Sequence, residues 1–177
     1  MLGDGHLRTL SLGLLALLAA GLAEPASALD YQVELVLFAY LDPDPREGPT
    51  VEVGGPAAGG ASFASAPRRL GGVAERLRNS RGYRVLAHEA WTQPDLPPAR
   101  ARAVGVSASD PEAGDVAGTV SLRRQRVMMA EIDLWYEDPR TYQRYRLHEV
   151  RRVRSGELHY FDHPRFGLVL EIDAGAQ

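Results

Sequence analysis

Apolar and polar residues alternate with a period of two in several segments, a pattern that indicates β-strands. The first such segment, residues 31–40 (YQVELVLFAY), is apolar on both of its faces and ends at the breaker DPDP of residues 42–45. A strand with two apolar faces is covered on both sides. We therefore expect this strand to lie in the centre of a sheet.

Residues 68–79 follow a helical period instead. Their apolar side chains at helical spacing are Leu70, Val73, Ala74 and Leu77. A second strand is predicted directly after this helix, at residues 83–91. Because a right-handed crossover makes two strands of one sheet parallel, the domain is predicted to begin with a β-α-β unit.

The remaining regular structure is predicted to be strands only. These strands cover residues 116–124, 127–136, 142–154 and 166–172. Two stretches rich in Pro, Ala and small polar residues, 42–67 and 97–115, are predicted to be flexible insertions. The expected fold class is α+β, with one helix packed on one side of a mixed, mostly antiparallel sheet.

Residues 1–28 are typical of a secretory signal peptide. An apolar stretch at residues 10–23 precedes Ala26-Ser27-Ala28, which fits a cleavage site. The stretch is shorter than the roughly 20 residues that cross a bilayer, so cleavage is expected and stable membrane insertion is not. The mature chain, residues 29–177, is then expected to be a single periplasmic domain.

Composition excludes several kinds of chemistry. The chain has 177 residues, a formal net charge of -3 and no cysteine. Disulfides, zinc-thiolate sites and cysteine nucleophiles are therefore ruled out. The small net charge gives no general argument for a nucleic-acid partner, and no motif indicates a cofactor.

The run RRVRSGELHYFDHPRFG at residues 151–167 is the densest group of functional side chains. His159 and His163 have a spacing that brings two metal ligands together on a helix, but the Gly and Pro of the run favour strand and turn, so no metal site is expected. Glu157 and Asp162 are candidates for acid–base chemistry, but no nucleophile or hydrolase motif accompanies them. A purely structural role, with turns and local ion pairs, explains the run as well.

A basic face with aromatic residues is the favoured binding surface. Between Ser121 and Arg154 there are nine arginines and five acidic residues. Aromatic rings stack on sugars and guanidinium groups bind carboxylates, so the face suits a glycan with acidic peptides; a solvated face with ion pairs is the alternative. The candidate ligand-binding residues are Trp135, Tyr142, Arg144, Arg146, Arg152, Arg154, His159, Tyr160 and Arg165.

Four segments, in order, resemble the CsiV family of periplasmic peptidoglycan-binding proteins. They are YQVELVLF from Tyr31, GYRVLAHEAWTQP from Gly82, IDLWY from Ile132 and the run from Arg151. The resemblance implies a non-enzymatic protein that binds peptidoglycan and supports its synthesis. The alternative is a docking module for a cell-wall synthase or its lipoprotein activator, without direct glycan binding.

Overall fold

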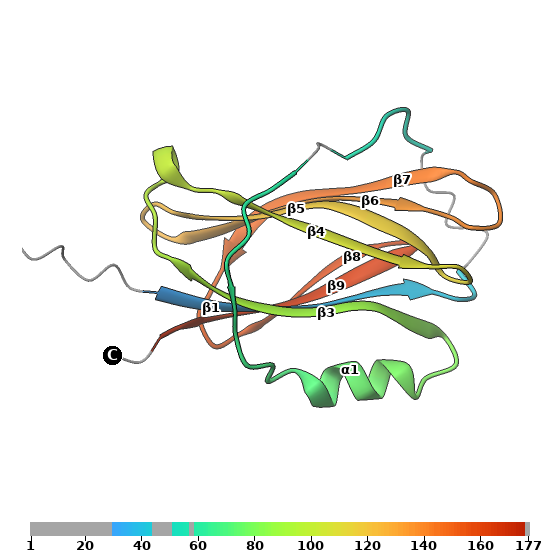
Figure 1. Cartoon of the computed structure of the whole chain (residues 1–177), viewed down its shortest axis with the longest axis horizontal. Helices are drawn as coiled ribbons and strands as arrows, with labels where there is room; N and C mark the ends of the chain where they lie inside the picture. The colour runs from blue at the N-terminus through green and yellow to red at the C-terminus, as the bar shows by residue number, and fades with distance from the viewer. Residues whose placement is uncertain (1–29, 44–50, 57–58, 176–177) are drawn as a thin grey trace, which may run out of the picture.

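The computed structural model describes residues 30–43, 51–56 and 59–175, so the predicted signal peptide lies outside the described residues. Two antiparallel sheets pack face to face (Figure 1). The five-stranded sheet has the order β2-β3-β1-β9-β8, with β1 at Asp30–Tyr40, β2 at Ala64–Ser65, β3 at Tyr83–Pro94, β8 at Leu158–His163 and β9 at Phe166–Ala174. The four-stranded sheet has the order β4-β5-β6-β7, with β4 at Ala103–Asp110, β5 at Gly114–Arg124, β6 at Met128–Glu137 and β7 at Arg144–Val153.

The core lies between the two sheets. Leu35 and Leu37 of β1 and Ile132 and Leu134 of β6 are fully buried there. Residues that alternate along a strand point to opposite faces, so the other face of β1 needs its own cover. Helix α1 (Gly71–Arg78) supplies it and lies outside the five-stranded sheet (Figure 1). The prediction that this strand is central is confirmed.

The predicted parallel β-α-β start is wrong, because β1 and β3 are antiparallel. Ala64 of β2 pairs with Thr92, which in turn pairs with Gln32 near the start of β1. The chain has thus already come back to the level of the start of β1 before the helix begins. Helix α1 then runs in the direction of β1, and β3 comes back beside it.

The segment 97–115 contains strand β4 in place of the predicted insertion. Val104 and Val106 point into the core, whereas the residues between and after them are small. The strand was not predicted because Val104 and Val106 are its only large apolar residues, and two residues are too few to show a period of two among Ala, Gly and Ser. A short 3₁₀ turn, Pro98–Arg100, precedes the strand.

The fold is a β-sandwich with one short helix, where a single mixed sheet was expected. All pairings between the strands of the described residues are antiparallel, and an isolated Ala61–Val104 bridge is parallel. Two sheets form because β5, β6 and β7 have an apolar face of their own, which packs on the inner face of β1 and β9. The mostly antiparallel pairing and the helix on one side are as predicted.

Candidate functional site

The predicted site residues do not form one surface. Trp135, Arg144, Arg146 and Arg152 lie on the outer face of the four-stranded sheet, and Tyr142 lies in the turn before β7. Arg154 and His159 lie near the β7–β8 turn, Tyr160 on the outer face of the five-stranded sheet, and Arg165 in the β8–β9 turn. The sequence predicted the alternation along β7 correctly, but not this separation.

On the outer face of the four-stranded sheet, acidic neighbours hold two of the predicted arginines. The Nε and Nη2 atoms of Arg146 donate to the two carboxylate oxygens of Asp133, at 2.7 and 2.9 Å. This bidentate pair lowers the pKa of Asp133 below its usual value. Arg144 Nε donates to Glu137 Oε2 at 2.7 Å. Each guanidinium therefore already has an acidic partner, which reduces its attraction for a ligand carboxylate.

A strap formed by residues 51–56 covers Trp135. The Glu52 N–H donates to the Arg144 carbonyl at 2.9 Å, and Arg144 Nη1 donates to the Gly54 carbonyl at 3.1 Å. Gly54 lies so close to the indole that a Cβ there would be 3.1 Å from Trp135 Cη2. Only 9% of Trp135 is exposed. Its ring therefore has no open face for a sugar.

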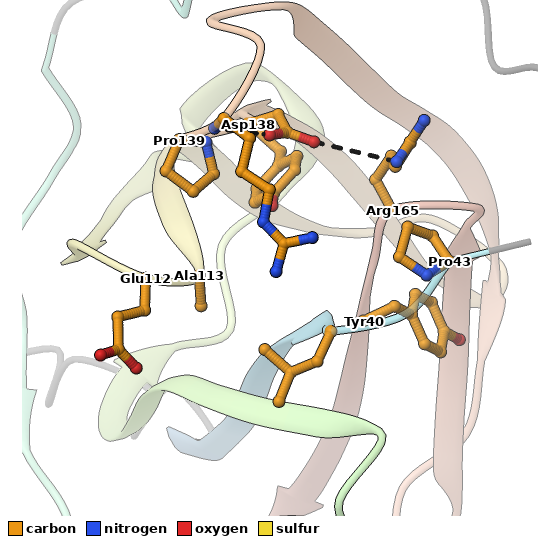
Figure 2. Close-up of a pocket in the computed structure, with 10 residues that line it drawn as sticks. Tyr40, Pro43, Glu112, Ala113, Asp138, Pro139 and Arg165 are labelled. Atoms are coloured by element: carbon orange, nitrogen blue, oxygen red, sulfur yellow. Dashed lines mark hydrogen bonds and ion pairs between the residues drawn. The ribbon is translucent and has the colours of Figure 1, made fainter. Parts of the chain in front are cut away.

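The three basic residues near the β7–β8 and β8–β9 turns also have partners. Arg154 lies 3.4 Å from Glu157 and its N–H donates to His159 Nε2 at 3.0 Å. Arg165 faces Asp138, which lies outside the run of residues 151–167, at 3.8 Å (Figure 2). The cavity around this pair holds about 30 Å³, which is room for a single water molecule.

Tyr142 and Arg152 remain exposed. Tyr142 is 77% exposed and has a φ of 57°, a left-handed conformation that is uncommon for a tyrosine. Arg152 has no ion pair or side-chain hydrogen bond among the described residues. These two residues alone do not make a binding surface.

An open groove lies on the other side of the molecule, on the outer face of the five-stranded sheet. Helix α1 covers only part of that face, where Leu70 and Ala74 pack on Val36. The groove beside the helix has a volume of about 420 Å³. It is lined by Phe38, Val73, Arg76, Leu77, Tyr83, Tyr160 and Val169, and we call it the aromatic groove.

Aromatic rings form the floor and one wall of the aromatic groove. The rings of Phe38 and Tyr160 are nearly parallel, with an interplanar angle of 7° and centroids 6.2 Å apart. Tyr83 meets Phe38 edge to face at 5.5 Å. Phe38 is buried, whereas Tyr160 is 46% exposed. The exposed tyrosine thus lies beside a parallel ring that is buried and held in place.

Gly167 of β9 creates the space for Phe38. A Cβ at this position would lie 2.7 Å from Cζ of Phe38, closer than real Cβ atoms come to heavy atoms of residues that are not their chain neighbours. Gly167 pairs directly with Phe38 across the sheet. The absence of a side chain here therefore lets the Phe38 ring lie over β9.

Polar groups adjoin these rings. The Tyr40 hydroxyl donates to Asp162 Oδ1 at 2.8 Å and is also hydrogen-bonded to the Tyr160 hydroxyl. Burial, together with the Asp162 charge, raises the pKa of Tyr160 to about 12 and raises that of Tyr40 as well. Both hydroxyls therefore stay protonated at neutral pH. Arg76 adds a cation for which the described residues contain no ion-pair partner.

Metal coordination has little support in the described part of the chain, where no three His, Asp or Glu residues lie close enough to hold an ion. His163 Nδ1 accepts a hydrogen bond from the Arg165 N–H at 3.2 Å, and burial lowers the pKa of His163. His159 is engaged by the Arg154 backbone. In the same described residues, the helices are too short and too polar to cross a bilayer.

Sequence reasoning missed Phe38, Tyr83 and Arg76, and included only Tyr160 of the aromatic groove. One signal was present, because the segment 31–40 is apolar on both faces and a single helix covers only part of one face. The order β3-β1-β9-β8, which brings Tyr83 and Tyr160 to the two sides of Phe38, was not visible in the sequence.

Comparison with protein families adds a direct result. The family described as peptidoglycan-binding protein, CsiV, matches residues 9–174, which is nearly the whole chain. No match was found among curated proteins, and none among solved structures. A family that binds this polymer is a family of the cell envelope, where the polymer lies. The length of the match shows that the chain belongs to the CsiV family of peptidoglycan-binding proteins.

Proposed function

We propose that this protein is exported to the periplasm, where it binds peptidoglycan without cleaving it and supports assembly of the cell wall. The glycan strand lies in the aromatic groove. One observation carries this assignment: in a chain of a peptidoglycan-binding family, the exposed ring of Tyr160 is supported by the buried Phe38 ring in an open groove. Sugar rings present apolar faces that stack on such aromatic surfaces.

The polar groups near the aromatic groove suit the same ligand. Sugar hydroxyl and amide groups donate and accept hydrogen bonds, which the Tyr40 hydroxyl and the Asp162 carboxylate can exchange with them. Arg76 offers a cation to the carboxylates of the stem peptides. A groove that is open at the surface also admits an inner segment of a long polymer.

Binding without cleavage agrees with the chemistry of the aromatic groove. Most glycosidases use two carboxyl groups, one on each side of the bond that they cut. The described residues that line the groove include no carboxylate. Asp162 lies next to Tyr160 in sequence and accepts the Tyr40 hydroxyl. A single acidic group that is already hydrogen-bonded supports recognition rather than hydrolysis.

Docking on a protein through the edge strand β8 is the alternative function. Strand β8 lies at the end of the sheet order and pairs with β9 on one side only, which leaves its other edge for an added strand, and Leu158 on it is 56% exposed. The guanidinium of Arg151, however, already donates to the Tyr160 carbonyl. Strand addition at this position has to displace that contact, so we favour the glycan.

Co-sedimentation with purified, protein-free sacculi tests the proposal. We expect the wild-type protein to bind and to release no soluble muropeptides. Tyr83→Ala removes one ring of the aromatic groove and should weaken binding about tenfold, which corresponds to about 1.4 kcal/mol. Arg146→Ala is the control on the opposite face and should bind like the wild type. Failure of the wild type to bind sacculi, with retention on a wall-synthesis protein, would establish the docking alternative instead.

A further inference from the structure

Glu89 of β3 is a carboxylate on the core side of the sheet. It pairs across the sheet with Leu35, a fully buried core residue, and therefore lies on the same face of the five-stranded sheet. Trp91, two residues further along β3, points the same way and is buried. An acidic side chain in this position normally has a partner, because burying an unpaired charge is costly.

No such partner is present among the described residues. Glu89 makes no side-chain hydrogen bond and no ion pair there. Burial raises the pKa of its carboxyl group, and the charge of Arg68 opposes this only in part. Half-buried carboxylates that lack a partner and face a cavity are candidates for ligand contacts.

Glu89 faces a cavity of about 790 Å³ on one open side of the sandwich. The segment from Gly60 to Arg68 crosses this side from β4 to the start of α1, as Figure 1 shows, and it is held by the Ala61–Val104 bridge. Trp91 forms part of the wall, and its indole N–H donates to Gln93 Oε1 at 2.8 Å. The volume lies within the range of about 300–1,000 Å³ that is typical of small-molecule sites.

The cavity carries both signs of charge. Arg68 lines it together with Glu89, although the two side chains form no ion pair with each other. A ligand of complementary charge has an ammonium group that contacts Glu89 and a carboxylate that contacts Arg68. An amino acid with a free amine and a free carboxylate has both groups. The serine and backbone groups of the crossing segment add hydrogen-bonding positions.

We infer that this cavity binds a stem peptide of peptidoglycan through its free amino group, which contacts Glu89, while a stem carboxylate contacts Arg68. This inference rests on the proposed function, and it adds a selectivity to it. An amine that has been converted to an amide, as in a cross-link between stems, has no positive charge for Glu89. The protein therefore prefers stems that are not yet cross-linked.

Calorimetric titration with soluble disaccharide-peptide fragments tests this selectivity. One fragment carries the free stem amine, and the second is the same fragment after acetylation of that amine. We expect the wild-type protein to bind the free amine about tenfold more tightly or better, since a hydrogen bond to a charged group contributes that much. Glu89→Gln should bind both fragments equally, and Glu75→Gln, an exposed helix carboxylate, should keep the preference.

Two controls separate the possible failures. The first control is thermal unfolding of Glu89→Gln, which should occur at or above the wild-type temperature because the substitution removes a half-buried unpaired charge. The second is titration of the wild type with a free diamino acid. Tighter binding of this amino acid than of the fragment would overturn the assignment to a stem. If the wild type binds sacculi but does not distinguish the two fragments, this inference is wrong and the proposed function stands. If the wild type binds neither sacculi nor fragments, the proposed function itself is wrong.

Discussion

The two outer faces of the sandwich contain the same kinds of side chain, yet only one of them is open. Both carry aromatic and arginine residues near the surface. On the four-stranded sheet, Trp135 is covered and Arg146 is paired with an acid. On the five-stranded sheet, Tyr160 is exposed and Arg76 has no acidic partner among the described residues. Residue type alone therefore does not identify the binding face.

Register explains the difference. Strand β6 places Glu131, Asp133 and Glu137 on the outer face, directly opposite or diagonal to the basic residues of β7. Exposed ion pairs contribute only about 0–1 kcal/mol each to stability. Their main effect here is to occupy the guanidinium groups. The outer face of β1 has Phe38 and Tyr40 near its end, and the acid beside them, Asp162, accepts the Tyr40 hydroxyl and is not paired with an arginine among the described residues.

The largest expected effect comes from closing the space under the aromatic groove. Gly167→Ala puts a Cβ 2.7 Å from the ring of the buried Phe38, so the ring or the strand has to shift. Overpacking of this kind costs about 2 kcal/mol. Urea denaturation should show the lower free energy of unfolding. Co-sedimentation should show weaker binding to sacculi.

A matched glycine substitution controls for the alanine itself. Gly71 lies at the start of α1, and a Cβ there meets no atom within 4 Å. Gly71→Ala should stabilise the protein by about 0.5–1 kcal/mol, because alanine favours a helix. Equal stability of the two variants would contradict the account of the Phe38 site.

A smaller effect is expected from removing one of two exposed tyrosines. Tyr160→Ala should weaken binding to sacculi about tenfold, equivalent to about 1.4 kcal/mol, since it removes the ring that contacts the sugar. Tyr142→Ala removes an equally large and more exposed ring near the four-stranded sheet and should leave affinity unchanged. The reverse order of affinities would move the binding face to the four-stranded sheet.

The smallest effect is expected from removing the ion pair between Arg146 and Asp133 on the outer face of the four-stranded sheet. Arg146 lowers the folded-state pKa of Asp133 below the ordinary value of 3.8. The ion pair therefore stabilises the folded protein at pH values above 3.8. This contribution disappears as the pH falls through the lowered pKa of Asp133. Asp133→Asn should cost about 0.5–1 kcal/mol at neutral pH. The variant should also lack this part of the acid-induced loss of stability, while its affinity for sacculi stays the same.

Several features of the fold were predictable because they depend on local patterns. The burial of both faces of the segment 31–40, the helix near Ala74 and the alternation in residues 127–136 all follow from side-chain periodicity. The antiparallel start was not predictable, since it depends on where the chain runs before the helix. No local pattern distinguishes a direct crossover from a connection that first returns to the level where β1 starts.

The proposed binding face was harder to predict than the fold. The sequence shows correctly that β6 and β7 are rich in basic and aromatic residues. The acids that pair with the arginines belong to the same two strands, and the sequence shows them only as a contribution to the net charge. Tyr83 and Tyr160 are far apart in sequence and meet only through the strand order. Phe38 looked like a core residue, and it is one, but it also supports the groove.

Chemical-shift mapping of the aromatic side chains with soluble glycan fragments tests the central claim most directly. The chain has two tryptophans, so the Trp135 indole N–H is easily assigned beside the ring signals of Tyr83 and Tyr160. Binding should move the two tyrosine signals and leave Trp135 in place. Movement of Trp135 with unchanged tyrosines would contradict the assignment and place the ligand beneath the strap at residues 51–56.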